Sequence, residues 1–153
     1  MLRLILAFSV AVLATGCASV LNDVNHPMKV EAKTQAGAMV TGADCALTND
    51  YGVFNVKSGD TVQVRRSSKD LAMSCKHPSN PEAVATAVSR ANGGMFGNIL
   101  LGGGIGAIID HNKGTAYSYP IWVQMIFGQT VVFDRKNEKD GVPTPGEAPV
   151  AAK

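Results

Sequence analysis

Residues 45–75, CALTNDYGVFNVKSGDTVQVRRSSKDLAMSC, decide the fold class, because short apolar runs alternate there with turn-forming residues. The strand-like runs cover residues 43–48, 53–56, 61–66 and 71–75. Between them, Asn and Asp tolerate left-handed backbone and Gly adopts positive φ without steric cost, which is typical of turns. The pattern predicts a mainly β protein, a meander of short antiparallel strands that closes into a small β-sandwich.

Strand-like patterns also flank this stretch. Residues 28–33 alternate apolar and charged side chains, as a half-buried strand does. Residues 79–92 fit either a helix capped by Asn80 or a strand with alternating faces, and we favour the strand. Residues 117–127 predict an aromatic-rich strand, followed by a turn and a final hairpin arm at residues 130–133.

The N-terminus has the pattern of an export signal. Arg3 supplies a positive charge, and residues 4–13 form an apolar run that is too short to span a membrane. Residues 13–17, LATGC, place small residues before Cys17 and resemble the bacterial lipobox. The resemblance implies that residues 1–16 are a signal peptide removed after Gly16. It also implies an S-diacylglycerol and an N-acyl group on Cys17 that anchor the chain to a membrane, with no further cofactor.

Ala18 follows the cysteine where an aspartate would favour the inner membrane. In this respect the chain resembles outer-membrane lipoproteins of enteric-type bacteria, which implies an outer-membrane, periplasm-facing location. Residues 17–27 are mixed and polar, and we expect them to form a tether. An ordinary secretory signal with an incidental cysteine is the alternative.

We predict a disulfide between Cys45 and Cys75. The chain has three cysteines, and lipidation of one leaves an even pair in an oxidising compartment. Closing such a loop is worth about 3 to 4 kcal/mol in the chain-entropy model. Two buried free thiols are the alternative. A metal site is not expected, because Cys75 and His77 lack a second ligand pair at zinc-like spacing.

The charge balance bears on possible partners. Fourteen basic residues face twelve acidic ones, which argues against nucleic acid, since that partner requires a basic stripe. One dense basic cluster is present, formed by Arg65, Arg66 and Lys69. We expect it to be the solvated tip of a hairpin, with binding of lipid headgroup phosphates as the alternative.

Residues 93–110, GGMFGNILLGGGIGAIID, carry no charge before Asp110 and are rich in glycine. Small residues recur at helical spacing, a stripe that lets another backbone approach closely. Its glycines are Gly93, Gly94, Gly97, Gly102 and Gly106. The segment resembles the glycine zippers of bacterial outer-membrane lipoproteins. We expect a helix or hairpin buried against the β domain; insertion in a bilayer, pairing with another copy and a disordered loop are the alternatives.

Residues 45–75 also resemble the small PEGA-type β domains of bacterial envelope proteins, through the turn spacing and the apolar strand after Gly59. The usual proline of the second turn is replaced by Ser58 and Gly59. The resemblance implies a non-catalytic binding or spacer module and names no ligand. Through its lipobox, cysteine pair and glycine-rich segment, the whole chain resembles uncharacterised small lipoproteins of Gram-negative bacteria.

The sequence does not point to an enzyme. It has no serine in a nucleophile elbow and leaves no free cysteine as a nucleophile. The scattered histidines are expected at the surface, and the aromatic residues after the glycine-rich segment are expected to pack in the core or at strand edges. These residues are His26, His77, His111, Tyr117, Tyr119 and Trp122.

We therefore predict a non-enzymatic, lipid-anchored envelope protein that binds or scaffolds another envelope component. The alternative is a membrane-active glycine-zipper protein that self-associates or inserts in the bilayer to perturb the envelope or exclude phage. Residues 28–134 are expected to form the β domain, with residues 93–110 as a helical insertion. Residues 135–153 are charged and proline-containing and predict a disordered tail.

Overall fold

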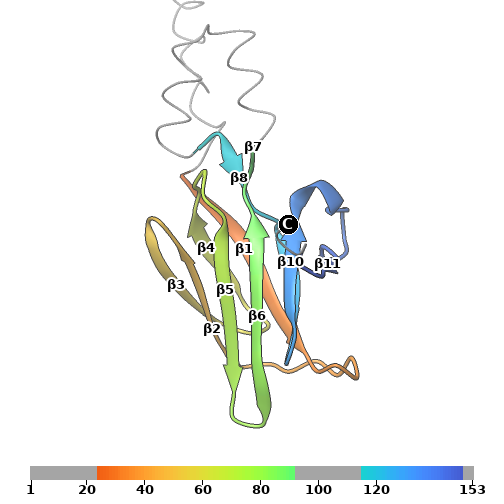
Figure 1. Cartoon of the computed structure of the whole chain (residues 1–153). Coiled ribbons are helices and arrows are strands. Elements are labelled where there is room, and N and C mark those ends of the chain that lie inside the picture. The colour runs from red at the N-terminus through yellow and green to blue at the C-terminus, as the bar shows by residue number, and fades with distance from the viewer. Residues whose placement is uncertain (1–23, 92–114, 150–153) are drawn as a thin grey trace, which may run out of the picture.

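A computed structural model describes residues 24–91 and 115–149 of the chain. A six-stranded sheet faces a three-stranded sheet, and a two-stranded ribbon lies at one end (Figure 1). The predicted mainly β fold is thus confirmed. The helical element in the described part is the 3-10 turn η1 (Arg135–Asn137), and no helix there is long and apolar enough to cross a membrane. The helix predicted for residues 93–110 lies outside the described residues.

The two sheets combine strands from distant parts of the chain. The smaller sheet has, in order, β4 (Thr61–Arg65), β1 (Asn25–Lys33) and β9 (Trp122–Ile126). The larger sheet has, in order, β11 (Gly146–Glu147), β10 (Thr130–Asp134), β6 (Asn80–Val88), β5 (Leu71–His77), β2 (Asp44–Asn49) and β3 (Gly52–Lys57). The ribbon pairs β7 (Arg90–Ala91) with β8 (Tyr117–Ser118).

The core lies between the two sheets, where alternate residues of each strand point inward. The strand favoured for residues 79–92 is confirmed as β6. Alanines form its inner face, whereas Val84 lies on the outer face and is exposed. The largest side chains of the core come from the second half of the chain and from β1, β2 and β5; they are Tyr119, Phe127, Phe133, Met28, Leu47, Leu71 and Met125.

The predicted meander is wrong at β4. The turn before β4 carries the chain across to the other sheet, because Gly59 N–H donates to the Val30 carbonyl at 2.8 Å and Val30 N–H donates to the Asp60 carbonyl at 3.0 Å. Gly59 has a φ of +106°, so glycine suits this sharp crossing. As a result β4 pairs with β1 and not with its sequence neighbours β3 and β5.

The predicted C-terminal hairpin is also wrong, although both of its strands are present. Gly128, at a φ of +76°, ends the turn between them, and the two strands then diverge into different sheets. β9 runs parallel to β1, and β10 runs parallel to β6. The turn between β9 and β10 therefore connects the smaller sheet to the larger sheet.

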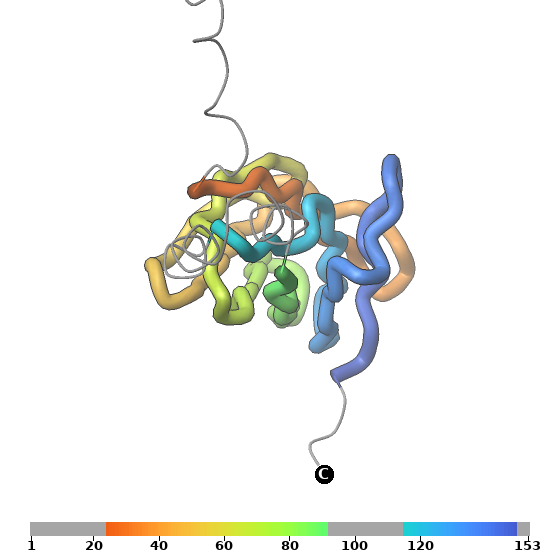
Figure 2. The backbone as a smooth tube through the Cα atoms, turned by 90° about the horizontal axis from the view of Figure 1, so that it is seen from above, coloured from red at the N-terminus to blue at the C-terminus, as the bar shows by residue number. Residues whose placement is uncertain are grey.

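The boundaries of the domain differ from those expected. β1 begins at Asn25, so the strand takes in residues assigned to the tether. Residues 135–149 do not form a disordered tail: Thr144 is buried, and its N–H donates to the Trp122 carbonyl at 2.8 Å. Gly146 in β11 packs its backbone against Phe133. Figure 2, seen along the strands, shows this segment in blue at the side opposite β3.

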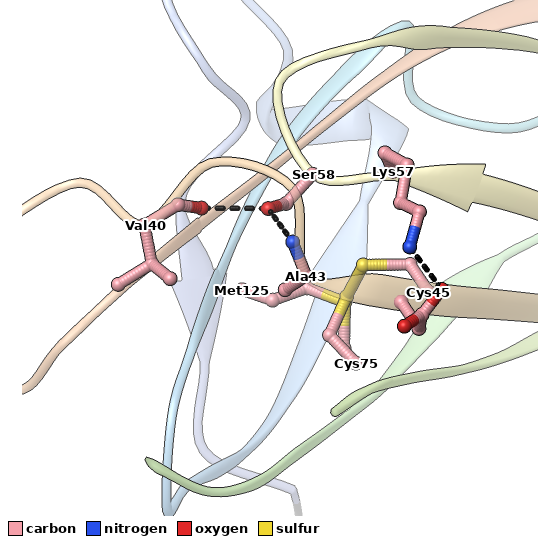
Figure 3. The surroundings of a disulfide bond; sticks show 8 residues. Val40, Ala43, Cys45, Lys57, Ser58, Cys75 and Met125 are labelled. Atoms are coloured by element: carbon pink, nitrogen blue, oxygen red, sulfur yellow. Dashed lines mark hydrogen bonds and ion pairs between the residues drawn. A yellow bond between two sulfur atoms is a disulfide. The ribbon is translucent and has the colours of Figure 1, made fainter. Parts of the chain in front are cut away.

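The Cys45–Cys75 disulfide is present and joins the neighbouring strands β2 and β5 within one sheet (Figure 3). Both cysteines are buried, and the Cys75 sulfur lies 3.2 Å from the Met125 sulfur of the opposite sheet. Nearby, the buried Ser58 hydroxyl donates to the Val40 carbonyl at 2.6 Å and accepts from Ala43 N–H at 3.0 Å. The bridge and this serine fix the start of β2.

Candidate functional site

One end of the sandwich, which we call the entry pole, gathers three chain passages. Val24 begins the described chain there, and Ala91 and Thr115 border the part of the chain that is not described (Figure 1). The β7–β8 ribbon brings the latter two together, with Ala91 opposite Tyr117. The residues predicted to be a lipid-anchored tether and a glycine-rich insertion are therefore attached at the same end.

Arg66 ties these passages to one another. Its backbone N–H donates to the Val24 carbonyl at 2.9 Å, and its guanidinium donates to the Tyr117 carbonyl at 3.0 Å and to the Ser118 hydroxyl. Arg66 is therefore a half-buried clamp and not part of the solvated hairpin tip that the sequence predicted. Its neighbours Arg65 and Lys69 are exposed, and the Arg65 guanidinium lies 4.1 Å from the centre of the Tyr51 ring.

The buried Tyr119 anchors the loops beneath the entry pole. Its hydroxyl donates to the Lys69 carbonyl at 2.7 Å and accepts from the Asn49 side-chain amide at 3.2 Å. The same amide donates to the Arg65 carbonyl at 2.8 Å. Burial is the main reason that the pKa of Tyr119 is raised. The prediction that Tyr119 packs in the core is confirmed, and its hydroxyl holds two loops together.

Arg90 and Asp134 form a two-pronged ion pair at the base of the ribbon. The Arg90 guanidinium nitrogens lie 3.0 Å and 2.5 Å from the Asp134 carboxylate oxygens. The carboxylate also accepts from the backbone N–H of Lys136 at 3.1 Å, and its side chain is only 8% exposed. The Arg90 guanidinium is the main cause that holds the pKa of Asp134 well below its usual range. This pair joins the end of β10 to the ribbon.

His26 is buried under the entry pole, contrary to the expectation that each histidine lies at the surface. Burial lowers its pKa from 6.5 to about 4, with further lowering by the charges of Arg66 and Arg135. Its Nε2 has no hydrogen-bond partner among the described residues. The neutral ring is therefore a packing element. His77 is half-buried at the end of β5, and His111 lies outside the described residues.

A second feature lies away from the entry pole, where the edge strands β3 and β4 diverge. A shallow hollow of about 580 Å³ lies at the turn that joins them and is lined by residues of β2, β3, β4 and β5. That volume lies within the range of about 300–1,000 Å³ that is typical of ligand sites. Its lining residues are Asp44, Cys45, Ala46, Asn55, Val56, Lys57, Asp60, Thr61, Val62, Ser74 and Lys76.

Both lysines that line the hollow are paired with carboxylates. Lys57 lies 2.5 Å from Asp44, and Lys76 lies 3.7 Å from Glu82. Asp60 makes no ion pair within residues 24–91 and 115–149. Asp60 is therefore the charged lining residue that lacks an ion-pair partner in the described part of the chain, and it lies beside apolar lining residues that include Val56 and Val62.

Only part of the predicted site can be compared with the described geometry. Cys45 and Cys75 form the expected disulfide. Cys17 and the glycine stripe of Gly93, Gly94, Gly97, Gly102 and Gly106 lie outside the described residues. In the part of the chain that the structure describes, no three His, Cys, Asp or Glu side chains are grouped to hold a metal.

Sequence reasoning missed both the clamp and the hollow. Arg66 is 51 positions from Tyr117, so no local pattern pairs them. The hollow depends on β4 leaving the larger sheet, which the predicted meander did not include. The Ser58–Asp60 turn was recognised, but not the change of sheet that it produces.

Comparison of the chain with protein-family models, curated proteins and solved structures found no match in any of the three. The resemblances to the lipobox, to PEGA-type domains and to small outer-membrane lipoproteins therefore remain predictions.

Proposed function

We propose that this chain is a non-enzymatic, lipid-anchored protein of the cell envelope, which binds or scaffolds another envelope component with its β domain. The observation that carries the proposal is the position of Val24 at the entry pole, next to the attachment points of the glycine-rich segment. The buried disulfide supports it, because disulfides persist in oxidising compartments such as the periplasm.

The length of the tether determines how the domain would face the membrane. Residues 18–23 separate the lipidated Cys17 from Val24, and the chain from Cys17 to Val24 reaches at most about 25 Å when fully extended. The nine residues of β1 alone span about 30 Å from the entry pole toward the far end. An anchor on Cys17 would thus hold the entry pole close to the bilayer. The β5–β6 turn and the hollow would be available to other envelope components.

Metabolic labelling tests the anchor. The full chain is produced in a Gram-negative host with labelled palmitate, beside Cys17→Ser and a Cys45→Ala/Cys75→Ala control. We expect label and membrane association in the parent and the control, and loss of both in Cys17→Ser. Label that persists in Cys17→Ser, or a parent without label, contradicts the anchor.

Site-specific photo-crosslinking tests the orientation. A photoreactive amino acid replaces the exposed Lys69 at the entry pole or the exposed Ser79 at the far end of the sandwich. We expect lipid adducts from position 69 and protein adducts from position 79. Lipid adducts that are equal at the two positions would contradict a membrane-facing entry pole.

A second candidate is the membrane-active glycine-zipper protein. It is favoured by the β7–β8 ribbon, which attaches residues 92–114 at the end where the tether reaches the β domain. Flotation with liposomes separates the two candidates, using a Cys17→Ser chain without residues 1–16 and the same chain with Gly102→Leu and Gly106→Leu. Flotation that the leucines abolish supports action through the membrane, whereas a monomer in the soluble fraction supports the first proposal.

A further inference from the structure

The two sides of the sandwich are closed to different degrees. On one side, β11 pairs with β10, and Thr144 bridges to Val123 of β9, so the segment after β10 covers both sheet edges. On the other side, β3 and β4 are the terminal strands of their sheets (Figure 2). Uncovered edges present backbone groups that can pair with another strand, and proteins commonly protect them.

The register shows which backbone groups of β3 face outward. Cys45 and Cys75 lie opposite each other with Cα atoms 4.1 Å apart, the close spacing of a pair without mutual backbone hydrogen bonds. The backbone of Cys45 must then bond on its other side, to Val56 of β3. By alternation, the N–H and C=O groups of Val53 and Asn55 point away from β2, toward the open side.

Common protective devices are sparse on β3. The strand has no proline, it pairs with β2 in continuous register without a bulge, and Lys57 at its end is its one charged residue. The neighbouring edge is better protected, because the Asn49 side chain caps the Arg65 carbonyl of β4. The disulfide joins β2, the partner of β3, to β5 and so fixes the strand that supports this edge.

The hollow continues from this edge. A strand added to β3 would place alternate side chains on the inner face, beside Val56 and over Val62 of β4, two apolar residues that line the hollow. Its end near the turn would lie beside Asp60, whose charge has no ion-pair partner among the described residues. A basic residue there would complement that charge.

We propose that the β3 edge binds an extended segment of another protein, which adds as a strand with alternating apolar residues and a lysine or arginine beside Asp60. This inference rests on the proposed function and names the class of its partner. Backbone hydrogen bonds to Val53 and Asn55 supply affinity. The hollow selects apolar side chains, and Asp60 selects a basic residue at the end of the segment.

The test uses the full chain, produced with its export signal and purified in detergent. The probe is a blocked, fluorescent octapeptide that alternates threonine and valine and ends in lysine. A second peptide has the same side chains but carries N-methyl groups on the edge-facing amides. We expect the first peptide to bind and the second to bind at least about tenfold more weakly, since two backbone hydrogen bonds are lost.

Protein variants locate the site. Asn55→Pro removes an outward N–H, whereas Asn55→Ala keeps it and serves as the matched control. We expect a loss of about tenfold for the proline variant and little change for the alanine variant. Asp60→Lys should favour a peptide ending in glutamate over one ending in lysine, and Asp140→Lys, a charge change at an exposed residue on the closed side, should not. If Asn55→Pro does not fold, the comparison of Asp60→Lys with Asp140→Lys still tests the site.

Several results would overturn the inference. These are no binding of the first peptide up to about 1 mM, equal binding of the N-methylated peptide, and unchanged preference in Asp60→Lys. A concentration-dependent dimer of the parent that Asn55→Pro abolishes would instead make β3 a self-association edge. Peptide binding is measured on protein purified in detergent, so its result does not depend on the result of the palmitate-labelling experiment. A labelled chain that binds no peptide refutes this inference alone.

Discussion

Removal of the Cys45–Cys75 bridge should destabilise the domain by an amount that its sequence separation sets. The two cysteines are 30 positions apart. For a loop of that length, the chain-entropy relation gives about 3.6 kcal/mol at 25 °C. A domain of this size is typically stable by only about 5–15 kcal/mol, so the loss would be a large fraction of the total.

Reduction and mutation separate the loop effect from packing. Urea unfolding is followed for a Cys17→Ser chain without residues 1–16, in its oxidised form, in its reduced form and as Cys45→Ala/Cys75→Ala. Reduction keeps both sulfur atoms, so we expect it to cost about 3.6 kcal/mol. The alanine pair also removes two buried sulfurs, one of which contacts Met125. That variant should therefore be less stable than the reduced protein, by about 1–3 kcal/mol.

Reduced and oxidised forms that unfold at the same urea concentration with the same slope would refute the predicted stabilisation by the bridge. An alanine pair that is as stable as the oxidised protein would refute it as well. A change in slope without a change in the extrapolated free energy would mean that the bridge mainly compacts the unfolded chain. In that case the entropy relation would not apply to this loop.

Three further perturbations test the contacts around the sandwich. Because Arg90 holds the pKa of Asp134 well below its usual range, their pair stabilises the fold above the unfolded-state pKa of about 4 and is lost on acidification. Asp134→Asn should therefore lower stability at pH 7 and flatten the acid-unfolding curve below about pH 4. Burial lowers the pKa of His26 to about 4, so stability should be fully present above about pH 6.5 and fall by up to about 3 kcal/mol toward pH 4. His26→Gln should remove that part of the slope in urea titrations. Gly128→Ala, at a φ of +76° and with a new Cβ 3.0 Å from a side-chain nitrogen, should cost about 1–2 kcal/mol or more in thermal unfolding. Gly141→Ala, at a similar φ but in open space, should cost less.

Local signals in the sequence were enough to predict most strands and the disulfide. The Asn49 side chain accepts from Tyr51 N–H at 2.9 Å, which is the turn chemistry that its residue type predicts. The alternation after Gly59 became β4 and that after Pro27 became β1. Even Pro27 fits, since β9 joins β1 only from Lys29 onward and leaves that side of Pro27 without a strand.

Distant pairings could not be predicted in the same way. Whether β4 joins β3 or β1 depends on backbone bonds between Gly59, Asp60 and Val30, which no periodic pattern contains. The order of residues 135–149 depends on Thr144 meeting Trp122, and their charged, proline-containing composition indicated the opposite. The entry pole likewise depends on contacts of Arg66 with residues far along the chain.

The parallel pairing of β1 with β9 determines when the domain can fold. Lys29 lies opposite Trp122, so the first strand of the sandwich acquires its second neighbour only after most of the chain has been delivered. Hairpins such as β2–β3 and β5–β6 close between neighbouring residues and can form early, whereas distant pairings form slowly. A chain that emerges N-terminus first, from a ribosome or an export channel, therefore completes neither sheet until its last third has emerged, because β9 belongs to the smaller sheet and β10 and β11 belong to the larger one. Until β9 has emerged, β1 can pair only with β4.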